Sequence, residues 1–122
     1  MPVLWSNLIN KGEYEMADVM NIREDNFHEE VIEAKKPVLV DFWAPWCGYC
    51  TKLAPVFDEL SVELGDKVNF VKVNVDENRK LTEKQGVMSL PTVLLYIDGE
   101  QVEKIVGFLP KAAIISKIKP HI

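Results

Sequence analysis

The sequence predicts a three-layer α/β domain in which helices flank a central mixed β-sheet. Three observations indicate this fold class: apolar runs typical of buried strands alternate with helical patterns, a hairpin signal follows them, and a last helical pattern closes the chain. Helices between the early strands require right-handed parallel crossovers, whereas the hairpin adds an antiparallel edge. The 122 residues suit one domain and can bury an ordinary core.

The first expected helix ends before a proline. Asp25 is a suitable cap, because its carboxylate can accept hydrogen bonds from the free N–H groups of a first helical turn. The residue before Pro37 is disfavoured in helical conformation, so the helix must end there. Its apolar positions recur at helical spacing and are Phe27, Val31 and Ala34.

The expected sheet has a central strand with neighbours on both sides. Residues 38–43 form a continuous apolar run interrupted by one acid, Asp41, which is the pattern of a parallel strand covered on both faces. A second buried strand is expected over residues 68–75 and a short one near residues 20–23.

The last two strands are expected to form a hairpin. Residues 92–97 and 101–106 are strand-like runs joined around Asp98 and Gly99. An Asp-Gly pair between two such runs is a strong signal for a tight turn. The hairpin makes the sheet mixed.

Three further helices are expected around these strands. Each is marked by a glycine or a proline at one end, since glycine readily ends a helix and proline fits at its first position. In the first of these helices, one face consists of Leu53, Phe57, Leu60 and Leu64, and Gly65 ends it. The second covers residues 78–85 before Gly86, and the third follows Pro110 with Ala113, Ile114 and Ile118 on one side.

The charge balance excludes some classes of partner. The chain has 14 Lys and Arg against 19 Asp and Glu, a formal net charge of −5, and no basic run. Nucleic acids and anionic membrane surfaces both need clustered cations, so neither is expected as a partner. The longest uninterrupted apolar run is far shorter than the roughly 20 residues that span a bilayer. No signal-peptide pattern is present, which indicates a cytoplasmic protein.

The first residues differ in character from the rest. Residues 1–19 are interpreted as an N-terminal extension and residues 20–122 as the domain. We hypothesise that translation starts at Met16, because Lys11-Gly12-Glu13 can be encoded by a purine-rich ribosome-binding sequence. Otherwise the apolar residues of the extension can form one helical turn, through Trp5, Leu8 and Ile9.

Cys47 and Cys50 are the only cysteines, and two residues separate them. In a reducing compartment such a pair is more often catalytic or metal-binding than structural. The pair follows a buried strand and precedes a helix, so Cys47 is expected at a helix N-terminus, where the dipole favours a thiolate. Cys47 is then the nucleophile and Cys50 the resolving thiol.

A zinc half-site and an inert buried pair are the alternatives for these cysteines. Zinc normally takes four protein ligands, and no second close pair of cysteines exists. His28 and His121 stand alone and far away in sequence. No metal is therefore expected, and no cofactor beyond a redox-active disulfide.

The segment from Val40 to Cys50, Val-Asp-Phe-Trp-Ala-Pro-Trp-Cys-Gly-Tyr-Cys, resembles the active-site segment of thioredoxins. The resemblance covers about residues 20–118 and implies a thioredoxin fold and reduction of protein disulfides. Other motifs carry it too: residues 72–76, Leu90-Pro91-Thr92, the Asp98-Gly99 hairpin and Val106-Gly107.

Asp41 has a physical reason to take part in the chemistry. Burial in an apolar strand disfavours its charged form and raises its pKa into a range useful for proton exchange. The resemblance implies that Asp41 relays a proton to or from Cys50. The alternative is that Asp41 is rescued by pairing with Lys72 on the neighbouring strand, and the two roles are compatible, so both residues belong to the expected catalytic set.

The resemblance also implies a substrate groove around the exposed sulfur. Pro91 matches the family's cis-proline, which lets the backbone of the residue before it pair with an extended substrate chain. Its place just before a strand, where a missing N–H is tolerated, supports this independently. The expected groove residues are Trp46, Gly48, Tyr49, Ser89, Leu90, Pro91, Gly107 and Phe108.

Tyr49 departs from the family, which usually has proline at this position. Proline fixes φ and lacks a backbone N–H, so its replacement adds a potential donor near Cys47 and relaxes the turn. Both changes stabilise the thiolate. We expect a redox potential somewhat less reducing than that of a typical thioredoxin.

The leading functional hypothesis is a monomeric protein-disulfide reductase that acts on oxidised proteins and is recycled by a thioredoxin reductase. A glutaredoxin-like enzyme is one alternative, because that family often has tyrosine at the position of Tyr49. An oxidase or isomerase domain of an exported protein is another. The last is a binding module whose interface is gated by the redox state of the cysteines.

Overall fold

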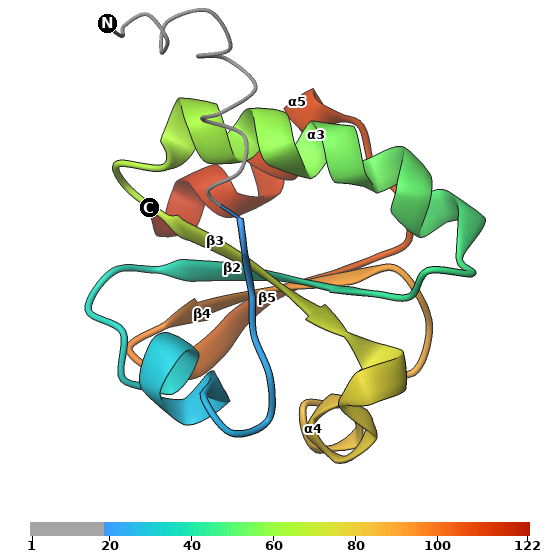
Figure 1. Ribbon diagram of the computed structural model, residues 1–122. Helices are drawn as coiled ribbons and strands as arrows, with labels where there is room; N and C mark the ends of the chain where they lie inside the picture. The colour runs from blue at the N-terminus through green and yellow to red at the C-terminus, as the bar shows by residue number, and fades with distance from the viewer. Residues whose placement is uncertain (1–18) are drawn as a thin grey trace, which may run out of the picture.

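A computed structural model of the protein describes residues 19–122 (Figure 1). The hypothesised start at Met16 and the helical turn around Leu8 lie outside the described residues. The described chain forms a five-stranded sheet in the order β1-β3-β2-β4-β5. The strands are β1 (Met20–Asn21), β2 (Val38–Trp43), β3 (Asn69–Asn74), β4 (Thr92–Ile97) and β5 (Glu100–Val106).

The sheet is mixed, and β2 is its central strand. β1 and β2 both pair with β3 in parallel, whereas β4 pairs with β2 and β5 in antiparallel fashion. Helices cover both faces: α3 (Gly48–Leu64) and α5 (Lys111–Ile118) lie on one, and α4 (Arg79–Lys84) and a π-helical segment (His28–Ile32) on the other (Figure 1). The predicted three-layer α/β class and mixed sheet are confirmed.

One half of the core lies between the sheet and the pair α3 and α5. Phe57 of α3 packs edge-on against Phe70 of β3, with ring centroids 5.2 Å apart. Burial of such side chains is the main favourable term in folding, about 25 cal/mol per Å² of apolar surface. The buried members of this cluster are Leu39, Leu53, Phe57, Leu60, Val68, Phe70, Val93, Leu95, Ile105, Ile114 and Ile118.

The other half of the core lies under α4 and the π-helical segment. Phe27 packs edge-on against Tyr96 of β4, with centroids 5.7 Å apart. The Tyr96 hydroxyl is satisfied by Gln85, to which it donates over 2.6 Å. Further apolar residues complete this cluster, among them Ile22, Val31, Leu81 and Val87.

The prediction that Asp25 caps the first helix is wrong. The helical segment begins after Phe27 and has no side-chain cap. Asn26 closes a turn instead, because its Oδ1 accepts from the Arg23 N–H at 2.8 Å. Asp25 forms an ion pair with the same Arg23, at 3.3 Å. Asp25 and Asn26 are therefore engaged with Arg23 in the turn, and the helical segment starts only at His28.

The first helical segment also ends earlier than predicted, at Ile32, so Ala34 lies outside it. The boundaries of the other elements follow the predictions with small differences. Gly86 and Gly99 adopt positive φ angles of 79° and 82°, and the hairpin turn also holds Asp98 at 53°. Gly65 ends α3, yet its φ of −63° is right-handed rather than left-handed. The strand expected over residues 68–75 is one residue shorter at each end. Within residues 19–122, no helix is long and apolar enough to cross a membrane.

Candidate active site

Cys47 and Cys50 form a disulfide at the start of α3, with their Cα atoms 5.2 Å apart. Cys47 is the N-cap residue of the helix, as predicted, and its Sγ accepts from the Cys50 N–H at 3.2 Å. Cys47 is 9% exposed and Cys50 only 3%. An incoming disulfide therefore reaches Cys47 more easily, and a helix N-terminus favours a thiolate there.

The turn from β2 into α3 is fixed by backbone hydrogen bonds. The Cys47 N–H donates to the Ala44 carbonyl at 3.1 Å, and the Thr51 N–H donates to the Cys47 carbonyl at 3.2 Å. The Thr51 hydroxyl donates to the same carbonyl at 3.3 Å. Cys47 itself is extended, with φ −91° and ψ 114°, so its side chain sits at the junction of strand and helix.

Asp41 lies in the middle of β2 and is 1% exposed. Burial raises the pKa of its carboxyl to about 7; the nearby charge of Lys72 opposes this rise, and that of Asp58 adds to it. Within the described chain, its Oδ1 has no hydrogen-bond partner. A carboxyl in this state exchanges a proton near neutral pH, which is the property expected from the sequence.

Lys72 is the register partner of Asp41 on β3. No ion pair between these two residues occurs among residues 19–122, so the direct pairing considered above is not what stabilises Asp41. The Lys72 ammonium instead lies 5.2 Å from the ring centroid of Trp43, a cation–π distance. Lys72 acts on Asp41 through its charge.

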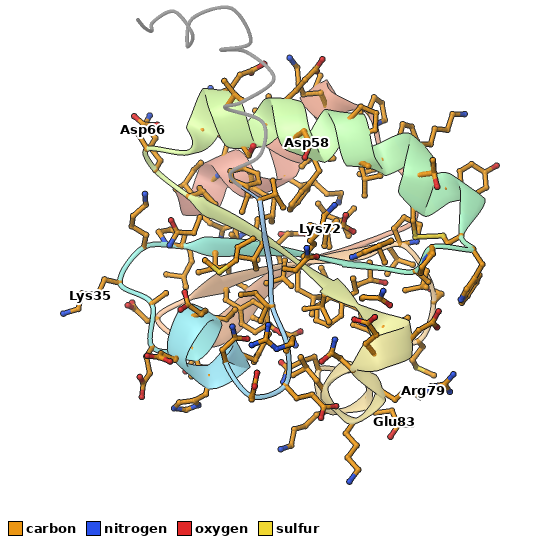
Figure 2. The ribbon with its side chains drawn as sticks, in the orientation of Figure 1. Lys35, Asp58, Asp66, Lys72, Arg79 and Glu83 are labelled. Atoms are coloured by element: carbon orange, nitrogen blue, oxygen red, sulfur yellow. A yellow bond between two sulfur atoms is a disulfide. The ribbon has the colours of Figure 1, made fainter. Side chains whose placement is uncertain are left out.

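Asp58 was not predicted as part of this group. It lies on α3, above Lys72 on β3 (Figure 2). Burial raises the pKa of Asp58, and the charge of Lys72 lowers it. No sequence signal distinguishes Asp58 from the other acids of an amphipathic helix, so only the packing of α3 on the sheet reveals it.

Trp46 is 70% exposed beside the disulfide. Its indole Nε1–H donates to both carboxylate oxygens of Asp76, at 2.9 and 3.2 Å. Asp76 is in turn oriented by Asn74, whose side-chain oxygen accepts from the Asp76 N–H at 2.9 Å. Asp76 belongs to a motif noted in the sequence, yet its bond to Trp46 could not be read from it.

A groove of about 250 Å³ opens between Trp46 and α4. Of the residues expected in a substrate groove, Trp46, Ser89 and Leu90 line it, whereas Tyr49 and Phe108 do not. An unpredicted residue at its rim is Met88, which is 94% exposed. The lining residues are Trp46, Val75, Asp76, Arg79, Thr82, Glu83, Val87, Met88, Ser89 and Leu90.

The remaining predicted groove residues form a second group. The Leu90–Pro91 peptide bond is cis, as the resemblance implies, and the Gly107 N–H donates to the Pro91 carbonyl at 2.8 Å. Tyr49 and Phe108 are linked through Lys52, whose ammonium lies 5.8 and 5.6 Å from their ring centroids. Gly48 has open space where a Cβ would be.

The described chain thus combines a disulfide at a helix start, a buried acid on the central strand and a cis-proline. The family model described as Thioredoxin matches residues 18–120. The chain belongs to the thioredoxin family. The resemblance inferred from the sequence is thereby confirmed.

Individual thioredoxins match the chain over nearly their whole length. That of Bacillus subtilis (strain 168) is 47% identical over 104 residues, which are 85% of this chain and 98% of the relative. That of Haemophilus influenzae (strain ATCC 51907 / DSM 11121 / KW20 / Rd) is 45% identical over 107 residues, 88% of this chain and 100% of the relative. That of Griffithsia pacifica is 41% identical over 104 residues, 85% of this chain and 95% of the relative.

This member of the thioredoxin family is a thiol–disulfide oxidoreductase, and its class of activity is protein-disulfide reduction. Its disulfide-forming pair supplies the reacting sulfurs. No group of three or more potential metal ligands is found among residues 19–122. Nothing in the geometry favours the glutaredoxin-like, exported or binding-module alternatives.

Proposed function

We propose that the protein reduces disulfides of oxidised proteins in the cytoplasm, acts as a monomer and is itself reduced by a thioredoxin reductase. The observation that carries this proposal is the Cys47–Cys50 disulfide at the helix start, next to an exposed Trp46 that lines a groove. The chain has no cysteine outside this redox-active pair and therefore no structural disulfide, which suits a reducing compartment. No cofactor beyond this disulfide is needed.

The reaction proceeds by two exchanges between sulfur atoms. In the reduced protein the Cys47 thiolate attacks a substrate disulfide, forms a mixed disulfide and releases one substrate thiolate. Cys50 then loses its proton and attacks the Cys47 sulfur, which releases the second substrate thiolate. The substrate gains two electrons and the protein is left with its own disulfide. A reductase returns the two electrons.

Asp41 is the proposed acceptor of the Cys50 proton. Its burial and its raised pKa support this role, since a carboxyl with a pKa of about 7 accepts and returns a proton at working pH. Lys72 supports it as the nearby positive charge that limits the rise of this pKa. We expect Asp41→Asn to slow resolution of mixed disulfides more than the first attack; equal rates for variant and wild type would remove Asp41 from the mechanism.

The substrate chain is proposed to lie across the disulfide between two groups of residues. Trp46, Ser89 and Leu90 supply one side, and the cis peptide bond before Pro91 leaves the backbone of Leu90 available to pair with an extended chain. The other side is supplied by the groove residues near the end of β5 and the start of α3, namely Gly48, Tyr49, Gly107 and Phe108.

Insulin reduction tests the proposed function directly. The protein is assayed with NADPH and a thioredoxin reductase, and in parallel with glutathione as the only reductant. Turnover with the reductase and little with glutathione supports the proposal, whereas efficient turnover with glutathione alone would favour a glutaredoxin-like activity. Cys47→Ser must abolish turnover in both assays. A Cys47→Ser variant that retains full biological function would instead indicate a binding module.

A further inference from the structure

The Lys52 side chain has an unusual position at the edge of the active site. Lys52 is two residues beyond Cys50 on α3. Its ammonium lies 5.8 Å from the Tyr49 ring centroid and 5.6 Å from that of Phe108, so two aromatic rings hold one cation. Because the rings come from α3 and from the segment after β5, the cation is held at a defined place beside the disulfide.

The ammonium of Lys52 keeps its hydrogen-bonding capacity. Among residues 19–122, no carboxylate forms an ion pair with it. Two other lysines, in contrast, are bound to oxygen acceptors: Lys111 pairs with Glu63, and Lys104 donates to the Gly86 carbonyl at 2.9 Å. A lysine ammonium has three N–H donors. The two aromatic faces attract its positive charge, and N–H donors therefore remain available for a carboxylate.

On the opposite side of the active site, the groove beside Trp46 has more negative than positive side chains. The groove beside Trp46 is lined by two carboxylates, Asp76 and Glu83, and by one guanidinium, that of Arg79. Figure 2 shows Arg79 and Glu83 together on α4. An acidic substrate residue is disfavoured on that side and favoured beside Lys52. The two sides of the disulfide therefore distinguish the two flanks of a substrate chain by charge.

We infer that Lys52 is a specificity-determining residue that binds an aspartate or glutamate carboxylate flanking one side of the substrate's cysteine. Tyr49 and Phe108 hold the ammonium in place, which lowers the side-chain entropy lost when the carboxylate binds. Tyr49 takes part because this chain has an aromatic ring where most thioredoxins have proline. The inference rests on the proposed function, since it requires that a protein segment lies across Cys47.

The test uses single-turnover reduction of short peptides by the reduced protein. Each peptide carries one cysteine joined to 2-thiopyridine, a neutral chromogenic leaving group, so attack of Cys47 on the peptide sulfur is followed directly. The residue before the cysteine is Glu, Gln or Lys in one series, and the residue after it is varied in the same way in a second. Lys52→Gln and Lys52→Glu are compared with the wild type.

Lys35→Gln is the matched control, because it removes the same charge at a distant place. Figure 2 shows Lys35 at the end of the molecule opposite the start of α3. An exposed ion pair is worth about 0.2–1 kcal/mol, so we expect the wild type to prefer Glu over Gln by about 1.4- to fivefold, in one series only. Lys52→Gln should bring this ratio to about one and Lys52→Glu should invert it, whereas Lys35→Gln should keep it.

The possible outcomes distinguish a failure of the Lys52 inference from a failure of the proposed disulfide reduction. A preference present equally in both series, or equally reduced by Lys35→Gln, would show general charge attraction and overturn the inference. An equal slowing of all peptides by Lys52→Gln would also overturn it, since Lys52 would then act on the Cys47 thiolate. If the wild type reduces the Gln peptides without a charge preference, the inference fails and the proposed function stands. If it reduces none of the peptides, the proposed function fails.

Discussion

Asp41 and Lys72 are register partners on adjacent parallel strands, yet the lysine ammonium lies over the Trp43 ring, 5.2 Å from its centroid. The charge of the ammonium lowers the pKa of Asp41. The ion pairs found among residues 19–122 do not, however, include one between these two side chains. Desolvation therefore dominates, and the carboxyl has a pKa of about 7. Full ion pairing would have produced a permanently charged carboxylate, which is a poor proton carrier at neutral pH.

The raised pKa of Asp41 makes the stability of the oxidised protein depend on pH. Its pKa is 3.8 in a model peptide and about 7 in the fold. Between these values the unfolded chain is ionised while the folded protein keeps the proton, so stability falls as pH rises from about 4 to 7 and then levels off. About three pKa units correspond to about 4 kcal/mol. We expect Asp41→Asn to remove most of this slope.

Urea unfolding of the oxidised protein at a series of pH values measures the slope. The slope is a better readout than stability at one pH, because any cost of burying the amide shifts every point equally. Asp66→Asn, in the exposed turn after α3, is the control and should leave the slope of the wild type unchanged. A variant at Asp41 that keeps the wild-type slope would show that another group is responsible.

Asp76 holds the exposed indole of Trp46 at the edge of the groove. Asp76→Ala removes the acceptor of the Nε1–H, which lies 2.9 Å from Oδ2. A net loss of about 1 kcal/mol corresponds to about a fivefold lower kcat/KM for insulin reduction. Glu77→Ala removes the same charge from the neighbouring residue and should have little effect. An equal loss in both variants would mean that acidity of this segment, rather than the hydrogen bond, matters.

The sequence predicts best those parts of the fold that local patterns determine. β2 has the predicted bounds, Val38–Trp43, because one continuous apolar run encodes a strand buried on both faces. The hairpin at Asp98 and Gly99 is predicted because those residues tolerate positive φ. The first helix was predicted with the wrong start, because the side chain of Asn26 closes a turn in competition with the helix.

The site was predicted as far as its residues lie in recognisable motifs. The cysteines and Pro91 belong to such motifs, and the structure places them as expected at the helix start and at a cis bond. The position of Asp58 near Asp41 and that of Lys52 between two aromatic rings were missed, because both arise from packing between segments distant in sequence. The groove was only partly predicted for the same reason, since α4 supplies one of its walls.

Tyr49 should tune the redox potential through its backbone rather than its ring. Tyr49→Pro removes a backbone N–H and stiffens the turn beside Cys47, which disfavours the thiolate of the reduced form. We expect the potential to become more reducing by about 20–30 mV, since 30 mV corresponds to about 1.4 kcal/mol. Equilibration with defined glutathione ratios measures it.

The control for this prediction is Tyr49→Ala. Alanine keeps the backbone N–H but lacks the ring, so its potential should remain near that of the wild type. If alanine and proline shift the potential equally, the ring is responsible and the backbone argument is wrong. A wild-type potential at or below that of an ordinary thioredoxin would also contradict it.

Gly99 connects the hairpin to the π-helical segment, and its replacement tests that contact. A Cβ at Gly99 would lie 3.0 Å from the Ile32 carbonyl oxygen and 3.2 Å from its Cγ2, and the φ of 82° is strained for any other residue. Gly86 has a similar φ of 79° but open space around the Cβ position. Gly86→Ala should therefore cost about 1–2 kcal/mol of unfolding free energy from the backbone alone. Gly99→Ala should lower the free energy of unfolding, measured in urea, by about 1 kcal/mol more than Gly86→Ala does, because Ile32 must move. Equal losses in the two variants would show that the His28–Ile32 segment shifts at no cost in free energy.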